Sequence, residues 1–178
     1  MFGMKLDDYP IFSRNKCSLK ECSRDDHNPS DIQYMTESGL QAVNFDFVKR
    51  EYANCLHHSE DHVASVDTVM QKDDHIVFIE FKNGTVQNRN ISDKIRDSLL
   101  IFMDITGQHL SDMRHQAEFI LVSNEKKNQS RNDIGKDLMK KGNQEFRLHG
   151  LEKYETLYFR RVHTYDQTEF DQYLKSLS

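Results

Sequence analysis

Residues 62–84, which read HVASVDTVMQKDDHIVFIEFKNG, constrain the fold of this chain more than any other stretch. Two runs rich in β-branched and apolar residues, 63–70 and 75–81, lie on either side of the polar segment 71–74. Apolar runs of this length around a short polar segment are typical of two strands joined by a tight turn. The sequence therefore predicts a β-hairpin here.

Charged residues interrupt both predicted strands. Asp67 lies in the first strand, and Glu80 and Lys82 lie in the second. If the hairpin turns on Asp73 and Asp74, Asp67 lies opposite Glu80, whereas a loop longer by two residues would shift this pairing. Residues two apart share a face of a strand, so one face of the second strand is wholly apolar and the other ends in charge. The apolar face consists of Val77, Ile79 and Phe81, and the other of Ile76, Phe78, Glu80 and Lys82.

Two carboxylates and a lysine on one patch of a mostly buried sheet indicate a particular chemistry. Neighbouring carboxylates repel one another and are costly to remove from water, so such a pair usually needs a cation. Mg²⁺ prefers oxygen ligands from one or two carboxylates, completed by water and substrate phosphate. A nearby lysine can orient the attacking water or stabilise the negative charge that develops. The alternative is an ordinary Glu–Lys ion pair on a solvated strand end.

The spacing of these residues resembles a known motif. Asp67, twelve intervening residues and Glu80-Phe81-Lys82 resemble the motif of the PD-(D/E)XK nuclease superfamily, where the acid lies on one strand and E-x-K on the next. A helix follows the second strand in that family. Val66 stands where the family has its proline. The resemblance implies that Asp67 and Glu80 are catalytic metal ligands and that Lys82 is the catalytic lysine.

The same resemblance implies a fold and a function. The fold is α/β with a restriction-endonuclease-like core, a central mixed β-sheet flanked by α-helices. The function is Mg²⁺-dependent hydrolysis of nucleic-acid phosphodiester bonds, with Mn²⁺ as a substitute ion. DNA is favoured over RNA because most of the superfamily cuts DNA. Small members occur in defence and toxin systems and are often homodimers. The alternatives are a non-catalytic nucleic-acid- or protein-binding module on the same fold and an interaction protein of unrelated fold.

A helix is predicted before the hairpin. Asn44 is a good N-cap, and apolar residues recur at helical spacing to about residue 57. In the superfamily this helix often supplies another acid, for which Glu51 is the first candidate, with Glu37 and Asp46 behind it. A solvent-facing Glu on an amphipathic helix is the alternative. Three histidines near the first strand are expected at the surface: His57, His58 and His62.

A second helix is predicted over residues 91–105, ended by Gly107. Ser92 or Asn90 is the expected cap. Lys94 lies early in this helix and is the candidate nucleic-acid contact, in a place where the superfamily often has a polar or basic side chain. The apolar stripe consists of Ile91, Ile95, Leu99 and Phe102, broadened by Leu100 and Met103.

Further elements are predicted after this helix. Residues 117–123 form a buried strand, residues 156–163 a strand near a sheet edge, and residues 168–177 a closing helix. Between them, residues 126–141 hold six basic and two acidic residues and include a predicted helix over 134–141. This basic stretch could contact phosphates or simply be a solvated surface.

Length and composition fit one ordered domain. The chain has 178 residues, of which 37% are hydrophobic and 30% charged. We expect a polar arm over residues 1–35 and a single nuclease-like domain over residues 36–178. The net charge of −5 argues mildly against a nucleic-acid partner, although a bound metal ion would offset part of it. No run of residues is long and apolar enough for a membrane span.

The cysteines favour a cytoplasmic location. Their number, three, is odd, which does not suggest a secreted disulfide framework. A zinc site at Cys17, Cys22 and His27 is disfavoured because the spacing lacks a C-x₂-C pair and a clear fourth ligand.

The superfamily's usual strand before the one that carries the acid is not evident over residues 57–62. It is either very short or replaced by a strand from the arm or from residues 156–163.

Overall fold

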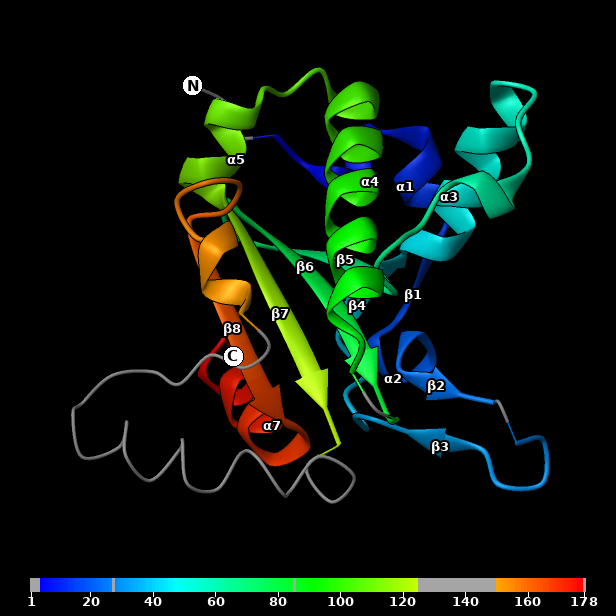
Figure 1. Cartoon of the computed structure of the whole chain (residues 1–178), viewed down its shortest axis with the longest axis vertical. Helices are drawn as coiled ribbons and strands as arrows, with labels where there is room; N and C mark the ends of the chain where they lie inside the picture. Colours follow the sequence, from blue (N-terminus) through cyan, green and yellow to red (C-terminus); the bar gives the residue numbers. More distant parts are fainter. Residues whose placement is uncertain (1–3, 27, 85, 125–149, 178) are drawn as a thin grey trace.

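The computed structural model describes residues 4–26, 28–84, 86–124 and 150–177. A six-stranded mixed sheet forms the centre of the molecule (Figure 1), in the order β1-β4-β5-β6-β7-β8. The first four strands in this order pair antiparallel, and β6, β7 and β8 pair parallel. The strands are β1 (Lys16–Ser18), β4 (Gln41–Asn44), β5 (Thr68–Lys72), β6 (His75–Lys82), β7 (Ala117–Ser123) and β8 (Arg161–Asp166). A separate two-stranded sheet consists of β2 (Arg24–Asp25) and β3 (Gln33–Tyr34).

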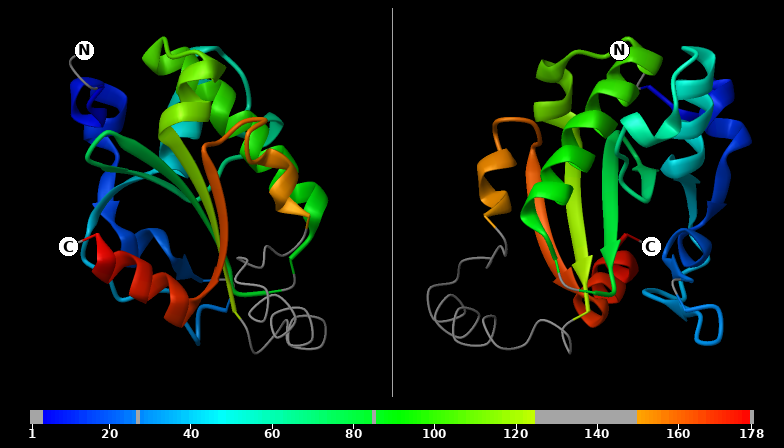
Figure 2. Two further views of the ribbon diagram at one scale, coloured as in Figure 1. Left: turned by 90° about the vertical axis from the view of Figure 1, so that its left-hand side faces the viewer. Right: turned by 45° about the vertical axis from the view of Figure 1, so that its right-hand side comes forward.

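Helices cover both faces of the sheet, so the predicted α/β class with a mixed sheet flanked by helices is confirmed. Figure 2 shows α4 and α7 on opposite sides of the strands. One core packs under α1, α3, α4 and α5, and the other under α2 and α7. The helices are α1 (Pro10–Arg14), α2 (Leu19–Cys22), α3 (Phe45–Cys55), α4 (Asn88–Thr106), α5 (Leu110–Gln116) and α7 (Gln167–Ser176). Short 3₁₀ turns span Leu6–Asp8, Glu60–His62 and Leu151–Tyr154.

The predicted hairpin and its register are confirmed. Strand pairing runs from Thr68 opposite Ile79 to Lys72 opposite His75, around a two-residue turn. Asp73 has a φ of 52°, a left-handed conformation that tight hairpin turns require and that Asp tolerates. The next pair in this register would be Asp67 and Glu80.

The first strand is shorter than predicted. β5 begins at Thr68, whereas the sequence indicated a start near Val63. Residues just before it do not join the sheet, because side chains of α4 take their backbone N–H groups. Ala64 N donates to Asp97 Oδ2 at 2.9 Å, and Val66 N donates to Ser98 Oγ at 2.9 Å.

The predicted helices around the hairpin are confirmed, with differences at their ends. Asn44 caps α3, where its side chain accepts a hydrogen bond from Phe47 N at 3.0 Å. Gly107 ends α4 in a left-handed conformation. The N-cap of α4 is Gln87, one turn before the predicted start. Leu100 was predicted to widen the apolar stripe but is 61% exposed, because it lies on the solvent side of the helix.

Both ends of the chain complete the sheet. The segment predicted as a polar arm contributes β1 at one edge and buries apolar side chains that include Leu6, Phe12 and Leu19. It also contains a disulfide between Cys17 and Cys22, which the odd cysteine count did not indicate; the third candidate zinc ligand, His27, lies outside the described residues. The sequence left open a strand from this arm or from residues 156–163; both segments contribute one, β1 and β8, and the strand next to β5 is β4.

The C-terminal predictions are confirmed in part. β7 has the predicted bounds, α7 is present, and β8 is an edge strand. β8 begins at Arg161 and not at Thr156, because residues 156–159 form a turn in which Thr156 N donates to Phe159 O and Thr156 has a φ of 64°. The basic stretch over residues 126–141 and its predicted helix lie outside the described residues. In the described ranges, no helix has the length and apolarity that crossing a membrane requires.

Candidate functional site

Asp67 is fixed where the chain enters β5. Its carboxylate accepts a hydrogen bond from Phe81 N at 2.6 Å, and its carbonyl accepts one from Phe45 N at 3.0 Å. The first bond ties Asp67 to the neighbouring strand and the second to the start of α3. The charged side chain of Asp67 is thereby held at the carboxyl end of β6, where Glu80 and Lys82 also lie.

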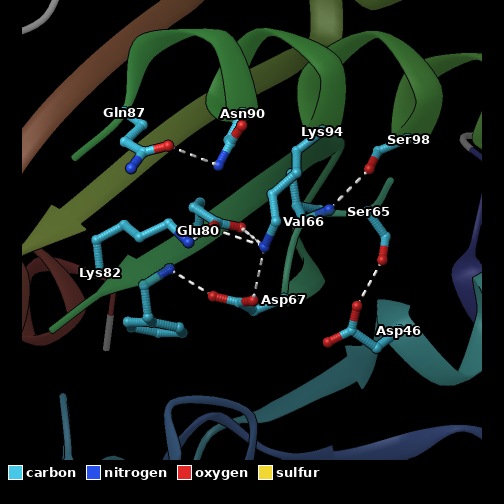
Figure 3. Close-up of polar contacts among 11 residues, drawn as sticks. Asp46, Ser65, Val66, Asp67, Glu80, Lys82, Gln87, Asn90, Lys94 and Ser98 are labelled. Atoms are coloured by element: carbon cyan, nitrogen blue, oxygen red, sulfur yellow. Dashed lines mark hydrogen bonds and ion pairs between the residues drawn. The ribbon is translucent and has the colours of Figure 1, made fainter. Parts of the chain in front are cut away.

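Glu80 and Lys94 form the centre of the site, as Figure 3 shows. The Glu80 side chain is fully buried, and Lys94 Nζ lies 2.7 Å and 2.9 Å from its two carboxylate oxygens. The same ammonium lies 3.4 Å from Asp67 Oδ1. Lys82 Nζ approaches from the strand itself, 3.1 Å from Glu80 Oε1. The structure thus brings together all four residues that the sequence singled out.

Helix α4 places Lys94 above the two carboxylates. One turn further along, its Asp97 and Ser98 side chains bind the backbone of residues 64–66. These bonds lock the helix against the segment that leads to Asp67. The sequence gave no indication of this role, since Asp97 and Ser98 are ordinary polar residues of a helix until the packing is known.

The electrostatics of the site reflect a shortage of positive charge. Burial, repulsion from Glu80 and a smaller contribution from Asp46 raise the pKa of Asp67 from 3.8 to about 7, although Lys94 and the Phe81 N–H group oppose this. Burial alone would lower the pKa of Lys94, but the carboxylates of Asp67 and Glu80 outweigh it and raise that pKa. The ammonium of Lys94 is therefore firmly charged, whereas the Asp67 carboxylate ionises less readily than an ordinary aspartate.

Asp46 is the acid of α3 that reaches the site. It lines the same cleft as Asp67 and Lys94, and it accepts a hydrogen bond from Ser65 Oγ at 2.5 Å. Glu51, the first candidate from the sequence, instead pairs with Arg14 and accepts a hydrogen bond from Asn15. Glu37 forms an exposed ion pair with Lys20. Of the three candidate acids, Asp46 is thus the one that lines the cleft, because the helix turns Glu51 toward α1.

A cleft of about 780 Å³ opens onto the site. The strand end forms one side of it, and the other comes from the N-terminal segment around the disulfide and β2. Asn83 joins the two sides, because its Nδ2 donates to Asp25 Oδ2 at 2.7 Å and to Gln33 Oε1 at 2.9 Å. The charged lining residues are five acids and three bases: Glu21, Asp25, Asp26, Asp46, Asp67, Arg24, Lys82 and Lys94.

The donor set of the site fits a divalent ion that is only partly held by protein. Asp67 and Glu80 face one common point, which the Lys94 ammonium occupies. Two carboxylates suffice for Mg²⁺, which keeps several waters and takes phosphate oxygens as further ligands. Within the described ranges, no cluster of three or more His, Cys, Asp or Glu side chains is placed to hold a metal. His57, His58 and His62 are exposed, as expected.

Comparisons of the chain with family models, curated proteins and solved structures each found no match. The interpretation of the site therefore depends on its residues and their geometry.

Proposed function

We propose that this protein is a divalent-metal-dependent nuclease of the PD-(D/E)XK type, with a restriction-endonuclease-like core and DNA as the favoured substrate. The observation that carries the proposal is the convergence of Asp67 and Glu80 on one cation position beside Lys82. Two neighbouring carboxylates at the buried end of a strand cost stability, so their presence indicates a task other than folding.

Each residue has a definite role in this proposal. Asp67 and Glu80 would hold Mg²⁺, with Mn²⁺ as a substitute. The ion would polarise the phosphate and lower the pKa of a bound water. Lys82, whose side chain is 29% exposed and already forms an ion pair with Glu80, orients the water and stabilises negative charge on the phosphate. Lys94 neutralises the two carboxylates and, when they hold an ion, would be free to contact the substrate phosphate.

The acidic lining of the cleft supports a requirement for the metal. The acids that line the cleft outnumber its bases, so a phosphodiester would meet net repulsion without an additional cation. A divalent ion between Asp67 and Glu80 would offset the excess of two negative charges among these lining residues.

Cleavage assays test the proposal directly. Single-stranded DNA, double-stranded DNA and RNA would each be incubated with Mg²⁺, Mn²⁺ or EDTA. The proteins would be the wild type, Asp67→Ala and Lys82→Ala, with Lys20→Ala as the control. Lys20 also pairs with a carboxylate, but at the exposed surface outside the cleft. We expect metal-dependent cleavage by the wild type and the control. The cleavage rate of Asp67→Ala and of Lys82→Ala should be lower by roughly 10²-fold or more.

The outcomes separate the explanations. Cleavage that survives both site substitutions in correctly folded protein would come from another site or a contaminant. An absence of cleavage on all three substrates with both metals would contradict the proposal.

A second candidate is a nucleic-acid- or protein-binding module without catalysis. The observation that favours it is the ammonium of Lys94, which already neutralises the carboxylates without a metal. In this case Mg²⁺ would leave the melting temperature unchanged, and Lys82→Ala would bind nucleic acid as the wild type does.

A further inference from the structure

Phe47 is exposed at the edge of the candidate site. It follows Asp46 in the first turn of α3, and 48% of the residue is accessible to solvent. The hydrogen bond from its backbone N–H to the Asn44 side chain fixes the backbone from which the ring projects. Large aromatic rings stabilise a fold mainly through burial, so this ring contributes little of what a core phenylalanine would.

Phe47 lines two hollows of the surface. It lines the cleft that holds Asp67, Lys82 and Lys94. It also lines a second hollow of about 510 Å³ along the outer side of α3, with Arg50 and Asn54 among the other lining residues. A chain that extends from the site along α3 would therefore pass over Phe47.

Arg50 lies next to the ring. Its guanidinium carbon is 5.2 Å from the centre of the Phe47 ring, within the range of a cation–π contact. Arg50 Nε in turn donates to Glu60 Oε2 at 3.0 Å. The guanidinium group thus lies over one face of the ring, and its ion pair with Glu60 holds it there.

The net charge of the cleft limits which ligands Phe47 and Arg50 can bind. Among the described lining residues, acids outnumber bases, so phosphates alone gain little attraction. A nucleic acid would then need favourable contacts to its bases, and stacking on aromatic and Arg side chains supplies these without regard to sequence. In a duplex the faces of the bases are covered by their neighbours, so only an unpaired base can stack on Phe47.

We infer that Phe47, together with Arg50, is a stacking platform for an unpaired nucleobase next to the scissile phosphate. The substrate is accordingly single-stranded or locally unpaired nucleic acid. This inference rests on the proposed nuclease function and narrows its substrate class.

Binding measurements test it. Fluorescence anisotropy would compare a labelled oligothymidylate with a labelled blunt duplex, in Mg²⁺ and on a Lys82→Ala background that prevents turnover. On that background, Phe47 would be changed to Ala, Leu or Tyr. The control is Leu100→Ala, which removes another exposed apolar side chain, on α4 and outside the cleft lining.

We expect Phe47→Ala and Phe47→Leu to weaken oligothymidylate binding roughly five- to 150-fold, the range for loss of one stacked base. Phe47→Tyr and Leu100→Ala should bind as the background does, and duplex binding should not change. Because Phe47 is exposed, these variants should fold, which urea unfolding would verify. An oligonucleotide with 5-iodouracil should photocrosslink to residue 47 or its neighbours.

Three results would overturn the inference. These are unchanged oligothymidylate binding in Phe47→Ala, full binding in Phe47→Leu, and an equal loss on the duplex. A failure of the proposed nuclease function would give a different result from each of these three. Phe47-dependent binding without any cleavage by the wild type would contradict the nuclease alone, whereas metal-dependent cleavage indifferent to Phe47 would contradict the platform alone.

Discussion

The two halves of strand β6 are equally buried but contain different chemistry. In the first half, Ile76 and Phe78 are each 1% exposed and pack under the helices that include α4. In the second half, Glu80 lies on the same face at 0% exposure. The apolar half needs only neighbours of the right shape, whereas the charged half needs a cation, which Lys94 supplies.

This difference separates what stabilises the fold from what serves the site. Burial of apolar surface makes the first half stabilising. In the second half, two carboxylates are removed from water and share one bridging ammonium. The free-energy cost of desolvating such charges commonly equals or exceeds the gain from their attraction. We therefore expect substitutions in the first half to act on stability alone and those in the second half to act on metal binding and pH dependence as well.

The largest effect should come from Phe78→Ala. Phe78 contacts the rings of Phe45, Phe102 and Phe159, with centroid distances of 6.3, 5.3 and 5.7 Å. Its loss would leave a cavity between the sheet and the helices. We expect the free energy of unfolding to fall by about 3–5 kcal/mol, measured by urea denaturation. Leu100→Ala is the control and should cost at most about 0.5 kcal/mol, because that side chain is exposed. A similar loss of unfolding free energy in the two variants would contradict the conclusion that the first half of β6 stabilises the fold.

Lys94→Met should have the next largest effect. It would leave Asp67 and Glu80 without their shared cation, at a cost of about 3 kcal/mol near neutral pH in the absence of metal. Added Mg²⁺ should stabilise this variant more than the wild type, because the ion no longer competes with the ammonium. Melting temperatures with and without Mg²⁺ would measure both effects.

Lys20→Met provides the matched control for this substitution. The Lys20 and Glu37 side chains are 38% and 75% exposed, so loss of their pair should change stability little and should not respond to Mg²⁺. Equal behaviour of the two methionine variants would show that Lys94 is an ordinary surface lysine.

The pH dependence of stability should identify Asp67. Its pKa is raised from 3.8 to about 7, so the folded state binds this proton more tightly than the unfolded state. The contribution of Asp67 to stability is therefore present at low pH and is lost as the pH rises from 3.8 to about 7.

The metal-free wild type should accordingly lose stability relative to Asp67→Asn across this window. Urea unfolding of the two proteins at several pH values would measure the difference. A constant difference in unfolding free energy would mean that Asp67 keeps an ordinary pKa. Mg²⁺ binding should weaken as the pH falls through 7, because the ion then competes with a proton.

The sequence predicted the local parts of this site and not their surroundings. The hairpin register followed from the spacing of apolar residues and the two-residue turn, so the nearness of Asp67 and Glu80 could be predicted. Lys94 could be placed early in α4, but its approach to within 2.7 Å of Glu80 depends on how the helix crosses the sheet. The cleft wall formed by the N-terminal segment depends on contacts such as Asn83 with Asp25, between residues far apart in the sequence. Hydrophobic periodicity contains no signal for such contacts.

Substitutions of the two acids of α3 should have the smallest effects on stability. They also test directly which side of the helix faces the site. Glu51 pairs with Arg14 at the surface, where the two side chains are 33% and 58% exposed. Glu51→Gln should therefore change stability by at most about 0.5 kcal/mol and leave Mg²⁺ affinity unchanged. Asp46→Asn, one and a half turns earlier, should weaken Mg²⁺ binding about tenfold, the usual loss for a group that supports metal ligands. Isothermal titration calorimetry would measure both affinities. The reverse result would place Glu51 at the metal and require α3 to be rotated from the orientation that Asn44 and Ser65 now fix.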